Sequence, residues 1–282
     1  MGEIRADLHV HSYYSDGVFS PEKIAELAEY AEVNALSLTD HDTMLGCLEA
    51  KTALSKRGII HINGIEISAY ERDVKLHTLG YNLDPENSAL KEFLRELYEN
   101  SLRRADDIIT KLNKNGVRLT LGEVLLERKC DFAPVHGMYI ARAAAKKGYA
   151  TTPFGFYSKY MTRSGCGYSD IGRPTPEKAI EIIREAGGVS SLAHPGRVEL
   201  DKSDLESLIK RLKRAGLCGI ECNYPAHTYS DTAYFKGIAK ECGLIVTGGS
   251  DMHYGDGKRN IGQPNFVLDS RAEELLIERK NS

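Results

Sequence analysis

Two patterns of hydrophobic and polar positions alternate along the first third of the chain. Short, mostly apolar segments predict strands, and segments with apolar residues every three or four positions predict amphipathic helices. Ser20 and Pro21 have the residue types preferred at a helix start, and Gly58 has the type preferred just after a helix end. The predicted strands are residues 3–11, 35–41, 59–68 and 74–83, and the predicted helices are residues 21–33 and 43–58.

The same alternation returns in the last third of the chain. Thr175 and Pro176 repeat the helix-start signal of Ser20 and Pro21. Regular alternation of strands and helices predicts parallel strands that close into an α/β barrel. The predicted strands are residues 189–195, 219–224 and 244–251, and the predicted helices are residues 177–188, 204–216 and 231–243.

The middle of the chain breaks this rhythm and is predicted to be nearly all helical. Residues 88–116 form one long amphipathic pattern that ends at Gly116, and residues 121–129 and 136–148 predict two shorter helices. We therefore expect a distorted barrel built from residues 1–84 and 169–282, with residues 85–168 inserted as a helical subdomain.

Composition and charge narrow the class of protein. The 282 residues suit one α/β barrel with an insertion, and 37 basic against 40 acidic residues give a net charge of −3. This near balance is not typical of a protein that holds nucleic acid by bulk charge. No apolar segment is long enough to cross a membrane, and the start lacks a signal peptide. The sequence predicts a soluble, cytoplasmic protein without a membrane partner or a stable nucleic-acid complex.

Histidines and carboxylates gather where the predicted strands end. Because side chains alternate along a strand, Asp7, His9 and His11 share one face. A single histidine in a strand is usually structural, as we expect for His61, but six strand-end histidines indicate a shared site. The carboxyl ends of barrel strands meet at one mouth. The candidate ligands are His9, His11, Asp16, His41, Glu66, His77, His194, Asp251 and His253.

These ligand types suit Mn²⁺, Fe²⁺ or Zn²⁺, because imidazole and carboxylate occur here without thiolate. The six cysteines form no CxxC pair, so neither a disulfide framework nor a zinc ribbon is predicted. The set of candidate ligands is too large for one ion and fits two or three divalent ions. Such a positively charged pocket favours phosphate. A water that bridges two ions is deprotonated near neutral pH and can attack phosphorus in line.

Six motifs in order resemble the PHP (polymerase and histidinol phosphatase) family: DLHVHSYYSDG, LTDHDT, GIEIS, HTLGY, LAHPGR and GGSDMH. The resemblance covers residues 6–83 and 175–255, and it is strongest to bacterial phosphoesterases of the nucleoside 3',5'-bisphosphate phosphatase type. It implies a distorted (β/α)7 barrel with a trinuclear site, often filled with Mn²⁺, Fe²⁺ or Zn²⁺, and we expect Mn²⁺. The implied ligands are His9, His11, Glu66 and Asp251 for the first ion, Glu66, His77 and His194 for the second, and Asp16, His41 and His253 for the third.

One segment departs from the pattern of these relatives. Where they carry Arg-Pro-His before an Ala-Arg-Ala helix, this chain has Gly137, Met138 and Tyr139. The predicted function is hydrolysis of phosphate esters of small metabolites of the nucleotide or sugar-phosphate type. The alternatives are a cyclic phosphodiesterase acting on ribose cyclic phosphates, an exonuclease on short oligonucleotides, and a catalytically inactive PHP module that only binds.

Further residues are assigned less direct roles. Arg197 is predicted to lie beside the reacting phosphate, and His136 to contact the other end of the substrate, because it precedes a helix whose free N–H groups favour anions. Arg142 is expected to be a packing residue and Asp42 a helix N-cap. Lys258 and Arg259 are expected to lie in a solvated turn. Glu221, at a strand end, is a weaker candidate for the barrel mouth. The sequence leaves the exact substrate, the choice of metal and the oligomeric state open.

Overall fold

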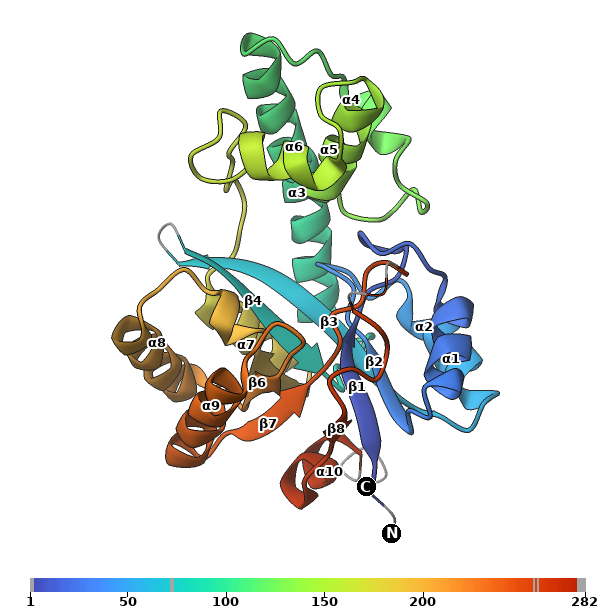
Figure 1. Cartoon of the computed structure of the whole chain (residues 1–282), viewed down its shortest axis with the longest axis vertical. Coiled ribbons are helices and arrows are strands. Elements are labelled where there is room, and N and C mark those ends of the chain that lie inside the picture. Colours follow the sequence, from blue (N-terminus) through green and yellow to red (C-terminus); the bar gives the residue numbers. More distant parts are fainter. Residues whose placement is uncertain (1–2, 72–73, 256, 258, 278–282) are drawn as a thin grey trace.

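The computed structural model describes residues 3–71, 74–255, 257 and 259–277, and their strands form a single sheet (Figure 1). Its strand order is β7-β6-β5-β4-β3-β2-β1-β8. The strands are β1 (Arg5–Val10), β2 (Ala35–Leu38), β3 (Ile60–Glu71), β4 (Val74–Tyr81), β5 (Val189–Leu192), β6 (Gly219–Asn223), β7 (Ile245–Gly248) and β8 (Phe266–Val267).

The sheet curls until its distant strands β1 and β7 approach each other. Val10 and Met252 form a parallel bridge, and the Asp251 N–H donates to the carbonyl oxygen of His9 at 2.7 Å. The result is a nearly closed barrel, which confirms the predicted α/β barrel class.

The predicted parallel pairing is confirmed for β1–β2, β2–β3, β5–β6 and β6–β7, but it is wrong for three other pairs. β3 pairs with β4 antiparallel, β4 with β5 antiparallel, and β8 with β1 antiparallel. The reason for the first is the connection: β4 begins three residues after β3 ends, and a link this short can only join antiparallel neighbours, since a parallel pair needs a long crossover.

Helices cover the outside of the barrel (Figure 1). Ser20 and Thr175 accept hydrogen bonds from helix N–H groups and cap α1 and α7, as predicted. Asp42 is not a helix cap, because the helix begins later, at Cys47, and the carboxylate of Asp42 accepts the N–H of Ser68 at 2.8 Å instead. The outer helices are α1 (Pro21–Tyr30), α2 (Cys47–Ser55), α7 (Pro176–Glu185), α8 (Lys202–Ala215), α9 (Tyr229–Cys242) and α10 (Ser270–Leu276), with a short 3-10 turn η1 (Pro195–Arg197).

Four helices between β4 and α7 rise above one end of the barrel (Figure 1): α3 (Ser88–Lys114), α4 (Leu121–Leu125), α5 (Gly137–Lys146) and α6 (Pro153–Tyr160). The first half of α3 packs Leu90 and Phe93 against the barrel helix α7. Its second half joins a separate apolar cluster with Tyr139 and Phe156. α3 therefore links two cores, and the boundaries 85 and 168 of the insertion stay a prediction. In the described part of the chain, no helix has the length and apolar character needed to span a membrane.

Candidate metal centre

All of the predicted ligand residues lie together at the barrel end that faces the insertion. His9 is in β1, with His11 just after it, and Glu66 is in β3. Asp251 and His253 follow β7, and the remaining ligands come from β4, from the segments after β2 and β5, and from the loop after β1. Every one of these side chains is at least mostly buried.

Glu66 lies at the centre of the cluster. Its Oε2 is 3.2 Å from Nε2 of His9 and 3.1 Å from Nε2 of His11, while its Oε1 is 2.7 Å from Nδ1 of His77 and 3.1 Å from Nε2 of His194. The two oxygens of one carboxylate therefore face two different pairs of imidazoles. This geometry suits a carboxylate that bridges two ions.

The other carboxylates complete two further groups. Asp251 Oδ1 lies 3.4 Å from both His9 Nε2 and His11 Nε2. Asp16 Oδ1 lies 3.2 Å from His253 Nε2. Ligand atoms within 4.8 Å of one another form three groups: His9, His11, Glu66 and Asp251; His11, Asp16, His41 and His253; and His41, Glu66 and His77.

The first group has the same members as the first ion's implied set. The other two groups differ from the implied sets. The group of Asp16, His41 and His253 also contains His11, and the group of Glu66 and His77 contains His41 in place of His194. His194 nevertheless lies 3.2 Å from His77 and 3.1 Å from Glu66. Which ion each side chain binds stays a prediction.

The donor atoms fit divalent cations. Nδ1 of His9 faces Glu221 Oε1 at 2.9 Å, so His9 donates its proton there and turns the lone pair of Nε2 toward Nε2 of His11, 3.1 Å away. Buried Glu66 Oε2, Asp16 Oδ1 and His41 Nδ1 have no hydrogen-bond partner. Acceptor atoms that converge in this way need a proton or a cation between them, and a bound cation can take that place. The buried clusters are thus consistent with multiple metal ions.

The charge states of the carboxylates also suit metal binding. Burial raises the pKa of Glu66, but His41, His77 and His9 lower it more, so it ends well below its usual range. Burial lowers the pKa of His77 to about 3, which keeps that ring neutral. Burial opposes protonation of His11 too, but Asp251 and Glu66 raise its pKa to about 10. Protons and metal ions therefore compete at this cluster.

A second layer of groups holds the ligands in place. Glu221 is fully buried, faces His9 Nδ1 through Oε1, and accepts the backbone N–H of His194 through Oε2 at 2.7 Å. His194 and Asp251 have positive φ angles of 27° and 51°, a conformation that costs energy in residues other than glycine. The surrounding contacts hold this strained backbone so that both side chains face the cluster. Glu221 therefore contacts ligands from behind and does not line the mouth.

Glu221→Gln is expected to weaken metal binding about 10- to 100-fold, because the amide accepts the proton of His9 Nδ1 less strongly and makes the imidazole a poorer ligand. Activity should recover in excess Mn²⁺. Titration of the metal-free protein with Mn²⁺ measures this, with Glu241→Gln on the exposed side of α9 as the matched control. Unchanged affinity in Glu221→Gln would show that this carboxylate has no part in holding the ligands.

Two arginines surround the outer oxygen of Asp251. Arg197 Nη1 donates to the hydroxyl of Tyr224 at 3.0 Å and lies 3.6 Å from Asp251 Oδ2, with half of its side chain exposed. Arg259 pairs with the same Oδ2. Arg259 was expected to lie in a solvated turn, which is wrong, and no periodic pattern near residue 259 indicates its contact. Lys258, expected in the same turn, lies outside the described residues.

His136 lies at the edge of the cluster. It caps α5, its Nδ1 is 3.2 Å from Asp16 Oδ2, and its ring stacks on that of His41 with centroids 4.8 Å apart. Arg142, expected to pack among small residues, instead donates from Nη2 to the carbonyl oxygen of Asp16 at 2.7 Å. The insertion therefore touches the ligand cluster directly.

A small cavity adjoins His136 between the insertion and the barrel. Its lining includes Arg104, Arg173, Tyr157 and Ser169. Arg104 is buried and donates from Nη1 to the carbonyl of Ile171 at 2.8 Å. Arg173 pairs with Asp42 at 3.1 Å, and its Nε has no hydrogen-bond partner. Two guanidinium groups thus lie one side chain away from the ligand cluster.

The PHP domain family matches residues 7–151. The chain is 33% identical to the 3',5'-nucleoside bisphosphate phosphatase of Chromobacterium violaceum, over 91% of this chain and 90% of that protein. It is 32% identical to the phosphoribosyl 1,2-cyclic phosphate 1,2-diphosphodiesterase of Eggerthella lenta, over 88% and 93%. It is 29% identical to the 5'-3' exoribonuclease Rnm of Escherichia coli, over 88% and 84%.

Solved structures show the same overall arrangement. An amidohydrolase from Chromobacterium violaceum with bound sulfate and no metal superposes with a TM-score of 0.84 and 30% identity, over 94% of this chain and 91% of that one. A protein from Bifidobacterium adolescentis gives a TM-score of 0.84 and 26% identity, over 97% and 96%.

Proposed function

This chain belongs to the PHP family of metal-dependent phosphoesterases, and we propose that it hydrolyses phosphate esters of small metabolites of the nucleotide or sugar-phosphate type. The observation that carries the proposal is the convergence of buried imidazoles and carboxylates, with unpartnered lone pairs, at one end of the barrel. Two or three divalent ions fit these donors, and Mn²⁺ is the ion we favour. Every expected type of metal-ligating residue is present, which argues against a catalytically inactive PHP module.

Different residues have different roles around the reacting phosphate. When bound, the ions supply Lewis-acid chemistry, lowering the pKa of water and offsetting the charge of the phosphoryl oxygens. Glu66 fixes the spacing of the ligand groups by presenting one oxygen to each side. Arg197, half exposed beside Asp251, places a guanidinium group at the rim, where it can donate to a phosphoryl oxygen. His136 separates this region from the arginine-lined cavity.

The cavity supports a substrate with a second anionic group. Lys75 lowers the pKa of the Tyr157 hydroxyl although burial raises it, and Arg173 lowers it further. The positive charges of Lys75 and Arg173 therefore act on this hydroxyl. The ring of Tyr157 occupies the space that a side chain at Gly137 would need, because a Cβ there would lie 2.8 Å from that ring. Arg104 and Arg173 then supply the positive charge that the missing Arg-Pro-His arginine would bring.

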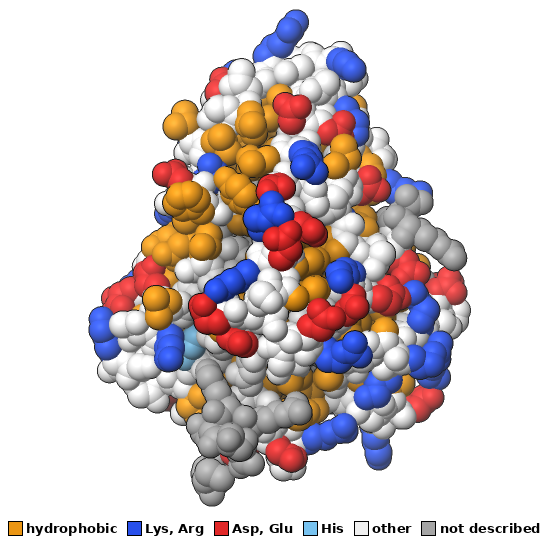
Figure 2. Space-filling model, turned by 180° about the vertical axis from the view of Figure 1, so that it is seen from behind, with side chains coloured by type: hydrophobic (Ala, Val, Ile, Leu, Met, Phe, Trp, Pro, Cys, Tyr) orange, Lys and Arg blue, Asp and Glu red, His pale blue; other side chains and the backbone are white. Residues whose placement is uncertain are grey.

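The relatives leave two other reactions open for this chain: hydrolysis of a cyclic phosphodiester and stepwise removal of nucleotides from short RNA. On the face drawn in Figure 2, basic and acidic side chains of the described residues are interspersed, without a continuous basic surface. A long nucleic acid needs many phosphate contacts, and this face offers no continuous basic surface for them.

A phosphate-release screen tests the function. With Mn²⁺ supplied, the protein is expected to release phosphate from nucleotides or sugars that carry two phosphates, and to lose this activity in a chelator. Re-addition of Mn²⁺ should restore it, because the ligand cluster then refills. Cyclic ribose phosphates and short 5'-phosphorylated RNAs belong in the same screen. A clear preference for either would replace the proposed substrate class, and no release from any ester with Mn²⁺, Fe²⁺ or Zn²⁺ would refute the proposal.

A further inference from the structure

One side of α5 faces the loop that carries Asp16. His136, Tyr139 and Arg142 follow one another at three-residue spacing, so they lie along the same side of the helix. The loop between β1 and α1 runs from residue 11 to residue 20 and contains turns but no regular element after β1 ends. A loop of this kind needs contacts from elsewhere to hold one conformation.

The contacts come from the helical insertion. The Tyr139 hydroxyl donates to the carbonyl oxygen of Ser15, and Arg142 Nη2 donates to the carbonyl oxygen of Asp16 at 2.7 Å. Tyr139 is fully buried, so its hydroxyl has no competing water. Two consecutive carbonyl groups of the loop are thus held by one helix.

Arg142 also joins two ligand-bearing segments. Its Nη2 lies 3.3 Å from the hydroxyl of Tyr254, the residue after His253, and its guanidinium carbon lies 5.8 Å from the centroid of the Tyr254 ring. The N–H of Val18 donates to the carbonyl oxygen of His253 at 2.9 Å. The loop of Asp16 and the segment of His253 are therefore fixed relative to each other, with Arg142 against both.

The side chain of Asp16 follows from this backbone position. Its Oδ1 lies 3.2 Å from His253 Nε2, and its Oδ2 lies 3.2 Å from His136 Nδ1. Neither Tyr139 nor Arg142 contacts a ligand atom of the cluster itself. Their hydrogen bonds to the loop are made to backbone carbonyls, which indicates an effect on where Asp16 lies and not on the substrate.

We infer that Tyr139 and Arg142 are positioning residues for the metal group of His11, Asp16, His41 and His253. The insertion thereby completes the metal centre as well as covering it. This inference rests on the proposed metal site. Its consequence is that the affinity for one ion should depend on α5, while the affinity for the ions around Glu66 should not.

Metal titration of Arg142→Gln tests the inference. The weakest-bound Mn²⁺ is expected to bind about 10- to 100-fold more weakly than in the wild-type protein, the size of effect typical for groups that orient ligands. Activity should fall equally on p-nitrophenyl phosphate and on the best substrate of the screen. Excess Mn²⁺ should restore it, since the ligands are displaced and not removed. Arg142→Lys should lose less, because an ammonium group still donates to a carbonyl.

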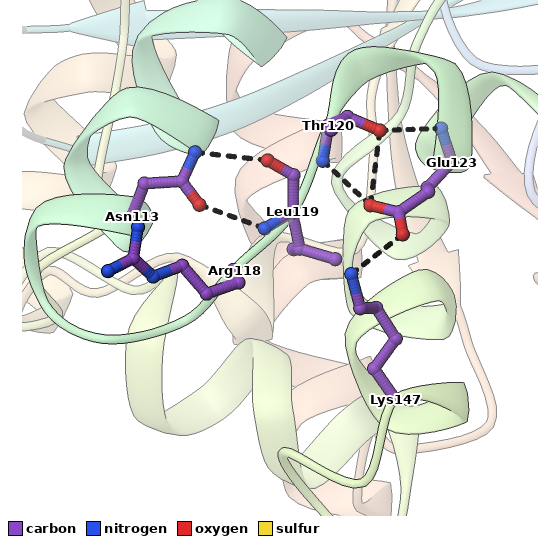
Figure 3. Close-up of a pocket in the computed structure, with 6 residues that line it drawn as sticks. All are labelled: Asn113, Arg118, Leu119, Thr120, Glu123 and Lys147. Atoms are coloured by element: carbon purple, nitrogen blue, oxygen red, sulfur yellow. Dashed lines mark hydrogen bonds and ion pairs between the residues drawn. The ribbon is translucent and has the colours of Figure 1, made fainter.

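Two further variants keep the test decisive. Tyr139→Phe removes only the hydroxyl that binds Ser15 and is expected to weaken the same ion in a fold that keeps its packing. Lys147→Gln is the matched control: Lys147 follows the last residue of α5 and pairs with Glu123 at 2.6 Å in the surface pocket of Figure 3, whose lining does not include Asp16. It should bind every ion as the wild type does.

Full metal affinity in both Arg142→Gln and Tyr139→Phe would overturn the inference. So would a loss confined to the best substrate, or one that excess Mn²⁺ fails to restore, because either result would place Arg142 against the substrate. A wild-type protein that binds its ions yet hydrolyses no phosphate ester would instead refute the proposed function, and the metal titrations would still decide the role of α5.

Discussion

Glu66→Gln is expected to lose bound metal and to lower kcat by roughly 10³-fold or more while the fold survives. The carboxylate places Oε2 near His9 and His11 and Oε1 near His77 and His194, so it serves two groups of ligands at once. An amide has the same shape but only one oxygen and no charge, and it cannot bridge two cations. Elemental analysis after Mn²⁺ loading, together with phosphate release, measures both effects.

The control for this variant is Glu71→Gln on the same strand. Glu71 pairs with Arg211 outside the cluster, and its loss should leave metal content and turnover close to the wild type. Circular dichroism of both variants shows whether the barrel is intact. Near-normal kcat with a full complement of metal in Glu66→Gln would rule out a bridging role for this residue.

The second large effect concerns the arginine-lined cavity. Arg104→Gln and Arg173→Gln are each expected to lower kcat/KM for adenosine 3',5'-bisphosphate about 10- to 100-fold, mainly through KM, because a hydrogen bond to a charged group contributes about 1.5–3 kcal/mol. Hydrolysis of the adenosine monophosphates, which lack the second anion, should change only a few-fold. Steady-state kinetics on this set of substrates gives the ratio directly.

Arg103→Gln provides the comparison. Arg103 precedes Arg104 on α3, but its side chain is 68% exposed and does not line the cavity, so the same charge is removed without touching the site. It should keep the wild-type ratio between the substrates. An equal loss on bisphosphate and monophosphates in Arg104→Gln and Arg173→Gln would mean that these arginines only support the fold.

His136 and Arg197 show which roles can be predicted from the sequence alone. Both were assigned to substrate on their position next to a helix start or a ligand motif. His136 lies at the edge of the ligand cluster and also lines the cavity, and Arg197 lies beside Asp251. Their contacts with substrate stay predictions. No such motif lies beside Arg259, Arg104 or Arg173. Only their contacts in the folded protein show that they lie near the ligand cluster or its adjoining cavity.

The sequence by itself predicted the barrel class, which the structure confirms, and also a run of helices between the two parts of the barrel and a set of candidate ligand residues at its strand ends. Each of these follows from local rules: side chains alternate along a strand, helices repeat about every 3.6 residues, and strand ends carry the polar residues of a barrel. His9 and His11 lie together because residues two apart on a strand share a face, whatever surrounds them.

Only the tertiary structure decided the antiparallel pairing of β4 with β5, the contact of Glu221 with His9, and the contact of Arg142 with the loop of Asp16. Glu221 and His9 are 212 residues apart in the chain, and Arg142 and Asp16 are 126 residues apart. A local pattern specifies which way a side chain faces on its own element. Which distant group it meets depends on how all elements pack, and no local pattern carries that information.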